Sequence, residues 1–409
     1  MNLTSYLAQL PTQPHARGTA FENKLIDLLP SHPDFKFKTV RRYSNWEHGA
    51  HDIGIDLVAL DQDGLWWAIQ AKCFDPERSI PKSEIDSFLA ASQGELKNWG
   101  RGFDRRLLIG TAGTLSENAR IVLKQTQPEV VVQLFDELDA AELDWAEKSK
   151  LPLKFSQVRL RDYQEKAVET VRSKFEITAK GQLIMACGTG KTITALEISK
   201  KMNAKKVLIL TPSLQLLRQT KQSWQKSGEL NGRNWLVICS DETAGDNFDS
   251  DQTEVLDLGF SVTTSPDEIS GFLRANDSFV IFSTYQSSEN LSLGCKSWGS
   301  EFDLVIADEC HRTVGNRDSS FGIVLDDLLI PSRKKLFMTA TPRTISPKLK
   351  LTASENNVEV SSMDDEDVYG KVLFQYSFAE AISEGHLAKY EIVVAAMDQK
   401  SVNELVNQT

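Results

Sequence analysis

Three polar side chains lie at chemically useful positions in an apolar stretch. In GIDLVALDQDGLWWAIQAK, residues 54–72, Asp56 lies near the start of one apolar run, and Gln70 and Lys72 end the next. Because side chains alternate along a strand, Gln70 and Lys72 share one face, where Asp56 on the neighbouring strand can meet them. Mg²⁺ prefers oxygen ligands, and a lysine can stabilise charge at a phosphodiester. Polar ends are also common in ordinary hairpins, so the spacing by itself is a weak pattern.

A nuclease interpretation gives each of these residues a role. Asp56 and Gln70 are expected to hold Mg²⁺, whose bound water supplies the nucleophile. Lys72 would position that water or neutralise the developing charge. Glu22, on a preceding helix, can add a carboxylate at the edge of the metal site.

A second candidate site lies in MACGTGKT, residues 185–192, between an apolar run and a helical stretch. Small residues let backbone N–H groups wrap a phosphate, and the helix N-terminus adds a favourable dipole. Lys191 would reach the β- and γ-phosphates, and Thr192 would ligate Mg²⁺. The strict pattern has glycine where this chain has Met185, and the alternative is a glycine-rich turn that only opens a helix. The residues expected to bind nucleotide here are Gly188, Thr189, Gly190, Lys191 and Thr192.

Paired acids end the apolar run LVIADECH, residues 304–311. Asp308 can hold Mg²⁺, and Glu309 can orient and deprotonate an attacking water. Paired acids also decorate the starts of helices. Together with the glycine-rich loop, however, they indicate machinery for nucleotide hydrolysis.

Further segments occur in the order typical of superfamily-two helicases and translocases, and residues 158–345 resemble that family. RLRDYQ resembles its adenine-sensing segment, with Arg161 and Gln164 as candidates. LTPSLQLLRQT and STYQS resemble its DNA-backbone motifs, which implies nucleic-acid contacts. DECH resembles its DExH-type box, and MTATPR resembles its coupling motif. The implied nucleic-acid residues are Thr211, Pro212 and Thr284, and the implied coupling residues are His311, Thr339 and Thr341.

The order of predicted elements separates two α/β domains. Residues 1–135 read as helix, strand, hairpin, helix, strand, helix and strand, and 136–157 as a helical connector. From residue 158 short Val/Ile/Leu runs alternate with helical stretches, which is typical of a parallel sheet covered on both faces. The second domain is therefore expected to be RecA-like and doubly wound.

The first domain resembles the PD-(D/E)xK nuclease fold, and specifically its Mrr-like restriction branch, over about residues 16–135. In that branch glutamine commonly replaces the middle acid, which agrees with Gln70. The family pattern places the metal ligand in the IDL unit, so Asp56 is preferred to the competing Asp52. His51 and Asp52 are then expected to be loop residues.

Composition describes a globular protein without deciding its partner. Of 409 residues, 41% are hydrophobic and 25% charged, and the net charge is −11. Acidic patches at 241–257 and 363–370 contrast with basic stretches at 39–46 and 97–106. The five scattered cysteines form no CxxC pair, which argues against a disulfide framework or a zinc site. No apolar run reaches the ~18 residues of a membrane span and no secretion signal precedes the domains, so a cytoplasmic location is expected.

A nuclease ahead of a helicase motor resembles the single-chain Type ISP restriction–modification enzymes. That resemblance implies ATP, Mg²⁺ and double-stranded DNA, and methyltransferase and target-recognition domains further along a longer chain. Residues 346–409 are too few for a second RecA-like domain, so they are expected to lead into one that this chain lacks. Without its arginine finger, which contributes about 10³–10⁵ in rate, we expect ATP binding with poor hydrolysis. The alternatives are a helicase–nuclease with separate partner subunits, a motor whose nuclease fold only binds DNA, and an RNA helicase.

Overall fold

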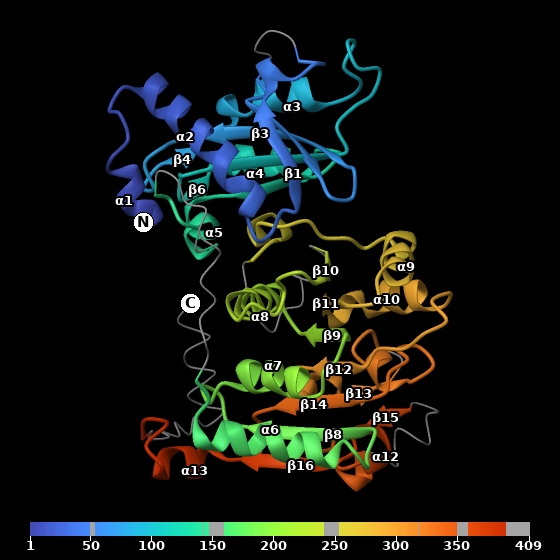
Figure 1. Ribbon diagram of the computed structural model, residues 1–409. Coiled ribbons are helices and arrows are strands. Elements are labelled where there is room, and N and C mark those ends of the chain that lie inside the picture. The colour runs from blue at the N-terminus through green and yellow to red at the C-terminus, as the bar shows by residue number, and fades with distance from the viewer. Residues whose placement is uncertain are drawn as a thin grey trace, which may run out of the picture.

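The computed structural model describes residues 1–49, 54–141, 143–146, 159–240, 253–317, 319–349 and 359–389. Its two α/β domains follow one another along the chain, one with a mixed sheet and one with a parallel sheet, as the sequence predicts (Figure 1). His51, Asp52, residues 142 and 147–157 of the connector, and residues 350–358 and 390–409 of the last segment lie outside the described residues.

The N-terminal domain has one main sheet with helices on both faces. Its helices are α1 (Leu3–Leu7), α2 (Pro14–Leu28), α3 (Asp86–Ser92), α4 (Glu117–Lys124) and α5 (Phe135–Ala140), with 3-10 turns η1 (Leu29–Ser31), η2 (Tyr43–Asn45) and η3 (Lys82–Glu84). Its strands are β1 (Phe37–Arg42), β2 (Leu57–Asp61), β3 (Trp66–Lys72), β4 (Ser79–Ile80), β5 (Arg105–Gly110), β6 (Thr114–Leu115) and β7 (Val130–Gln133).

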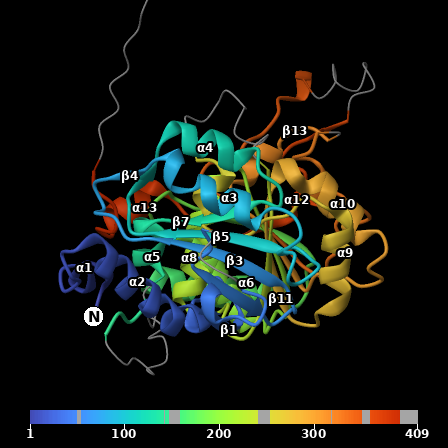
Figure 2. The same ribbon diagram turned by 90° about the horizontal axis from the view of Figure 1, so that it is seen from above.

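The main sheet has the order β1-β2-β3-β5-β7. Strands β1, β2 and β3 are antiparallel neighbours, whereas β3, β5 and β7 run parallel. Alternate residues of each strand enter different cores: Leu57 and Ile69 pack toward α1 and α2, and Val58 and Ala68 pack toward α3 and α4. Figure 2 shows α3 and α4 along one side of this sheet and α2 along the other.

Asp61 fixes the turn between the two hairpin strands that carry the candidate nuclease residues. One of its carboxylate oxygens accepts the backbone N–H groups of Asp63 and Leu65 at 3.0 and 2.8 Å, and the other accepts the indole N–H of Trp67 at 2.8 Å. Gly64 adopts φ +83°, which favours glycine. The polar turn DQDG therefore sets the register that brings β2 alongside β3.

The second domain is a parallel sheet covered on both faces. Its helices are α6 (Asp162–Lys174), α7 (Lys191–Lys201), α8 (Leu214–Lys226), α9 (Pro266–Ala275), α10 (Ser288–Cys295), α12 (Glu366–Tyr369) and α13 (Phe378–Ser383), with 3-10 turns η5 (Val255–Leu258), η6 (Tyr285–Ser287), η7 (Cys310–Thr313) and η8 (Ile323–Leu325). Its strands are β8 (Lys180–Met185), β9 (Lys206–Thr211), β10 (Asn234–Ile238), β11 (Phe279–Thr284), β12 (Leu304–Ala307), β13 (Gly315–Asn316), β14 (Lys335–Thr339), β15 (Val360–Ser361) and β16 (Lys371–Tyr376).

The seven strands of the large sheet have the order β10-β11-β9-β12-β14-β8-β16, and every neighbouring pair is parallel. Val207 and Ile209 of β9 face the core under α6, α7 and α8, whereas Leu208 and Leu210 face the core under α9 and α10. All carboxyl ends of a parallel sheet lie along one edge, so the loops after β8, β9, β12 and β14 meet there.

Two segments that lie outside the domain boundaries expected from sequence pack with the domains. The boundaries remain predictions. Trp145 stacks on Phe21 with ring centroids 6.3 Å apart, so the chain after α5 belongs to the first core. Strand β16 pairs with β8 and therefore completes the first motor sheet. The sequence alone predicts that these residues, 371–376, belong to a segment that leads into a further domain. Within the described residues, no helix is long and apolar enough to cross a membrane.

We predict that Trp145→Ala destabilises the first domain by about 3–5 kcal/mol, because it removes a large side chain that is 1% exposed. The measurement is urea unfolding followed by far-UV circular dichroism. Ile121→Ala is the control, since Ile121 is 45% exposed on the same domain and its loss is expected to cost less than about 1 kcal/mol. Equal stabilities of the two variants would contradict the assignment of Trp145 to this core.

Candidate active sites

The carboxylate of Asp56 lies against the end of strand β3. It accepts a hydrogen bond from the Gln70 side-chain amide N–H at 2.5 Å and another from the backbone N–H of Ala71 at 2.7 Å. The backbone N–H of Asp56 donates in turn to the carbonyl of Ile69. The hairpin thus brings Asp56 and Gln70 together, as the alternation of the strands predicts.

The amide oxygen of Gln70 is buried and has no hydrogen-bond partner. Its orientation follows from chemistry, because an ionised carboxylate only accepts, so the NH₂ group must face Asp56 and the oxygen must point elsewhere. Gln70 is 4% exposed, and an unsatisfied buried oxygen costs free energy. A cation beside this oxygen would satisfy it.

Lys72 lies at the same end of β3, and its ammonium contacts the Glu84 carboxylate on η3 at 2.9 Å. Glu22, on α2, contacts the Arg42 guanidinium at 2.8 Å. Burial raises the pKa of Asp56 to about 6, and the charge of Glu22 adds to this, whereas the Ala71 N–H and Lys72 oppose it. The four residues singled out from the sequence therefore share one electrostatic environment.

These residues fit a divalent metal with oxygen ligands. Asp56 and the unpartnered oxygen of Gln70 would hold it, and Lys72 lies beside them. In the described part of the chain, no three acidic, histidine or cysteine side chains form a group suited to a metal. Waters complete the shell of Mg²⁺ readily.

Two charged neighbours of this site were not identified from the sequence. Glu84 precedes α3 in KSEIDSFL, a stretch whose spacing of apolar residues predicts a helix and no ion pair. Arg42 ends β1 within the basic stretch 39–46. Nothing in the local pattern pairs Glu84 with Lys72 or Arg42 with Glu22, since both contacts depend on how the sheet and helices pack.

The glycine-rich loop connects β8 to α7 and has the backbone of a phosphate-binding turn. Gly188 and Gly190 adopt φ +80° and +83°, and Gly190 is the residue before the first turn of α7. The φ of Gly190 favours glycine, and a Cβ there would lie 2.4 Å from the side-chain nitrogen of Gln164 and would displace that amide. Thr192 follows at the second position of α7, partly buried.

The segment that resembles an adenine sensor holds this loop. The Gln164 amide donates to the carbonyl of Thr189 at 3.0 Å, and the Tyr163 hydroxyl donates to the same carbonyl at 3.0 Å. The Gln164 oxygen accepts the backbone N–H of Arg161 at 2.9 Å. Base reading by Arg161 and Gln164 stays a prediction, and in this structure Gln164 positions the loop.

A chain of contacts runs from the loop lysine to the end of β14. The Lys191 ammonium lies 3.2 Å from the Glu309 carboxylate, and the other oxygen of that carboxylate lies 3.3 Å from the His311 imidazole. The same imidazole nitrogen is 2.9 Å from the hydroxyl of Thr339, which accepts the backbone N–H of Thr341 at 3.1 Å. Residues from three strand ends thus meet at one edge of the sheet.

The two acids after β12 have opposite electrostatic settings. Burial raises the pKa of Asp308 to about 6, and the charge of Glu309 adds to it. Burial would also raise the pKa of Glu309, but the contacts with His311 and Lys191 outweigh it and hold that pKa below its usual value. Glu309 is therefore ionised at neutral pH. It adopts φ +46°, an uncommon backbone for a residue with a side chain.

The candidate nucleic-acid residues lie at the next two strand ends. Thr211 and Thr284 are register partners that end β9 and β11, and both are buried. The carbonyl of Pro212 accepts the side-chain N–H of Gln286 at 3.2 Å. The fold thus places all three on the edge that also carries the ATP-site residues.

Two family models match the chain. The model described as "Restriction endonuclease" matches residues 30–152. The model described as "Type III restriction enzyme, res subunit" matches residues 157–344.

The chain spans about a quarter of the length of the curated relatives it matches. A probable helicase A859L of African swine fever virus is 32% identical over 58% of this chain and 24% of its own length. The Type I restriction enzyme EcoAI endonuclease subunit of Escherichia coli is 26% identical over 56% of this chain and 24% of its own.

One solved structure covers both domains: the ATP-dependent Type ISP restriction-modification enzyme LlaBIII bound to DNA. It superposes with a TM-score of 0.73 over 96% of this chain and 26% of its own chain, at 29% sequence identity. The chain therefore joins an Mrr-like restriction endonuclease domain to a restriction-enzyme helicase domain, and over nearly its whole length it has the fold of the matching quarter of a Type ISP restriction-modification enzyme.

Proposed function

We propose that this chain is the nuclease and first motor domain of an ATP-dependent restriction enzyme that cuts double-stranded DNA with Mg²⁺. The observation that carries the nuclease assignment is the buried, unpartnered oxygen of Gln70, whose amide N–H group binds Asp56, with Lys72 at the same strand end. The likeness to a DNA-bound Type ISP enzyme over both domains supports double-stranded DNA as substrate.

In the nuclease site, Asp56 and Gln70 would bind the metal, which when bound supplies Lewis acidity and an activated water. Metal binding draws on the ionised form of Asp56. Lys72 would turn from Glu84 toward the scissile phosphate and stabilise its added negative charge. Glu22, held by Arg42, adds negative potential at the site edge.

In the motor, the loop backbone at Gly188–Gly190 and Lys191 would bind the phosphates of ATP, and Thr192 and Asp308 would hold the accompanying Mg²⁺. The phosphates would compete with Glu309 for Lys191. Glu309, ionised and released from that contact, would then accept a proton from the attacking water. His311 touches both Glu309 and Thr339, which links hydrolysis to the segment ending in Thr341.

The longer protein would supply the remaining parts. A second RecA-like domain would complete the ATP site and permit translocation. Methyltransferase and target-recognition domains would follow by analogy with Type ISP enzymes. A motor whose nuclease fold only binds DNA is the second candidate, and the contact that holds Lys72 on Glu84 favours it.

The first prediction concerns DNA cleavage. With Mg²⁺, the 409-residue chain should nick supercoiled plasmid, and Lys72→Ala should lower the rate about 10²–10³-fold because a charge-stabilising group is lost. Lys191→Ala should still nick. Lys82→Ala is the matched control, because Lys82 is a neighbouring lysine that pairs with Asp86 at the surface. If the parent shifts DNA on a gel but leaves it intact, the DNA-binding alternative is the correct one for these domains.

A second prediction tests the metal ligands without cleavage. Gln70→Glu places a second carboxylate beside Asp56, so it should lower the melting temperature in EDTA and bind Mg²⁺ more tightly. Mg²⁺ at about 100 times the dissociation constant stabilises a protein by about 2.7 kcal/mol, so the gain on adding Mg²⁺ should exceed that of the parent. Gln62→Glu, in the exposed turn of the same hairpin, is the control. Equal gains for both variants would refute the assignment.

A third prediction concerns ATP. Lys191→Ala should weaken binding of Mg-ATP about 10–100-fold, because hydrogen bonds to charged groups contribute about 1.5–3 kcal/mol. Equilibrium titration with a fluorescent ATP analogue measures this. Lys200→Ala lies on the same helix and removes a lysine that pairs with Glu197, so its affinity should match the parent. Unchanged affinity in Lys191→Ala would place the nucleotide elsewhere.

A further inference from the structure

Helix α8 and turn η5 of the motor lie directly beneath the nuclease domain (Figure 1). The motor contributes Arg218, Lys221, Glu254, Asp257 and Gly259 to this contact, and the nuclease contributes Asp34, Arg120, Lys124, Gln133 and Glu137. The sequence drew attention to the acidic patch 241–257, and neither proposed site uses it.

At the centre of the contact is an ion pair between Lys221 of α8 and Asp34 of the nuclease. Lys221 is 1% exposed, and its ammonium also lies 4.4 Å from the Trp235 ring centre and 4.6 Å from that of Phe260. Burial would raise the pKa of Asp34, but Lys221 and His32 hold it below its ordinary value. Burial lowers the pKa of His32 to about 4, so the imidazole is neutral at pH 7 and the two charges balance.

Around this pair, side chains of the nuclease pack closely against the backbone of the motor at Gly259. The Gln133 side chain donates to Asp34 at 3.2 Å and to the carbonyl of Gly259 at 2.9 Å. Gly259 adopts φ +76°, and a Cβ there would lie 2.7 Å from the side chain of Glu137. Leu256 of η5 is buried in the nuclease core that holds Val132.

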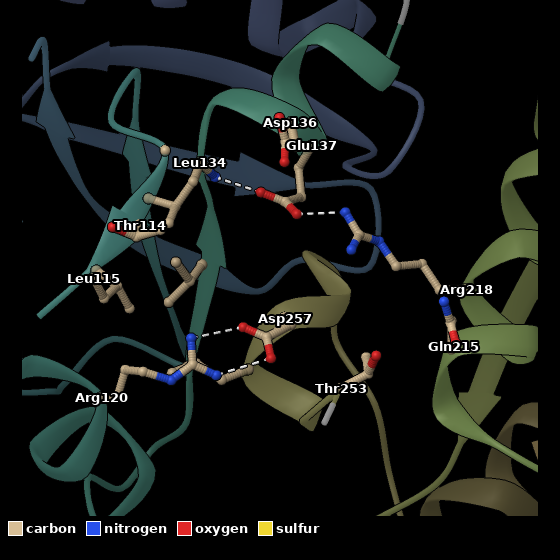
Figure 3. A pocket seen from close by; sticks show the side chains of 13 residues that line it. Thr114, Leu115, Arg120, Leu134, Asp136, Glu137, Gln215, Arg218, Thr253 and Asp257 are labelled. Atoms are coloured by element: carbon tan, nitrogen blue, oxygen red, sulfur yellow. Dashed lines mark hydrogen bonds and ion pairs between the residues drawn. The ribbon is translucent and has the colours of Figure 1, made fainter. Parts of the chain in front are cut away.

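Charged pairs surround a cavity of about 440 Å³ on one side of the contact. Figure 3 shows Arg120 of α4 beside Asp257, and Arg218 of α8 beside Glu137. Arg120 also contacts Glu254 at 2.6 Å. The described end of the acidic patch is thus neutralised by the basic helix of the nuclease.

The helix that carries Arg218 and Lys221 begins at the ligand edge of the motor. Ser213 caps α8, accepting the backbone N–H of Leu216, and it lies two residues after Thr211. A helix is stiff along its axis, so displacement of its first turn displaces the side chains one and two turns later. The candidate DNA contact at Thr211 and the nuclease are therefore joined by one short rigid element.

We propose that α8 and η5 clamp the nuclease to the motor through the buried Lys221–Asp34 pair, so that the nuclease moves as one body with the motif at Thr211. The partner of the acidic segment 253–257 is then this chain's own nuclease domain. The functional consequence rests on the proposed function: the motor fixes where the nuclease meets DNA. The clamp itself does not require either activity.

The clamp predicts that a substitution in the buried pair opens the contact between the domains, whereas a surface substitution does not. Removing one member of a buried ion pair leaves an uncompensated buried charge, which is strongly destabilising. Lys221→Met leaves the Asp34 carboxylate buried without its cation, and Asp34→Leu, in the other domain, leaves the Lys221 ammonium buried without its anion. Both substitutions should open the contact, although the two altered side chains belong to different domains. A fault confined to one domain would not give this shared result.

The experiment is hydrogen exchange followed by mass spectrometry on the full chain without DNA or ATP. In Lys221→Met and in Asp34→Leu, amides of η5 should exchange at least about 10-fold faster than in the parent, the result of a loss of 1.4 kcal/mol or more. Lys201→Met, a surface lysine paired with Glu169 on α6, should leave η5 unchanged. Binding of Mg-ATP by Lys221→Met and by Asp34→Leu verifies that the motor domain is folded.

Unchanged η5 exchange in either variant would overturn the clamp. Because exchange is read without DNA, a failed clamp and a failed nuclease assignment give different results: the first leaves η5 protected, and the second leaves plasmid intact while η5 still opens. Faster exchange in both variants with the control unchanged establishes the clamp.

Discussion

Both candidate sites depend on a carboxylate that the fold buries at the end of a strand. Asp56 and Asp308 each have a pKa raised to about 6, first of all by burial. A buried anion needs donors or a cation close by, and that need organises its surroundings. Around Asp56 the amide of Gln70 and the N–H of Ala71 provide donors, and around Asp308 the N–H of Glu309 does so.

The two sheets meet this constraint in different ways. In the mixed sheet, an antiparallel neighbour brings Asp56 beside Gln70, so the ligands come from two adjacent strands. In the parallel sheet, each strand contributes one loop, and Lys191, Glu309 and Thr339 meet although they follow three separate strands. Antiparallel pairing thus places the two candidate metal ligands side by side, whereas parallel pairing gives a line of contacts along the carboxyl edge of the sheet.

Sequence patterns predicted what depends on local order. The strands, the loop at Gly188–Thr192 and the convergence of Asp56 with Gln70 follow from alternation and from the rule that parallel strands share a carboxyl edge. The pairing of Lys72 with Glu84 and the return of β16 to the sheet depend on packing between distant segments, which no local pattern encodes. The contact of Gln164 with the loop was not predicted for the same reason, since its amide meets the Thr189 carbonyl only once α6 packs on the loop.

The net charge of −11 does not by itself make every surface of the chain repel DNA, because several of the acids lie in ion pairs between the domains. Glu254 and Asp257 face Arg120, so these acids are matched inside the molecule and repel no DNA at the contact itself. Asp34 is likewise balanced by Lys221. Acids used in this way raise the negative count without making the ligand edge negative. Net charge therefore reports the solubility of the whole chain, and the potential at Thr211 and Lys191 has to be judged from the residues around them.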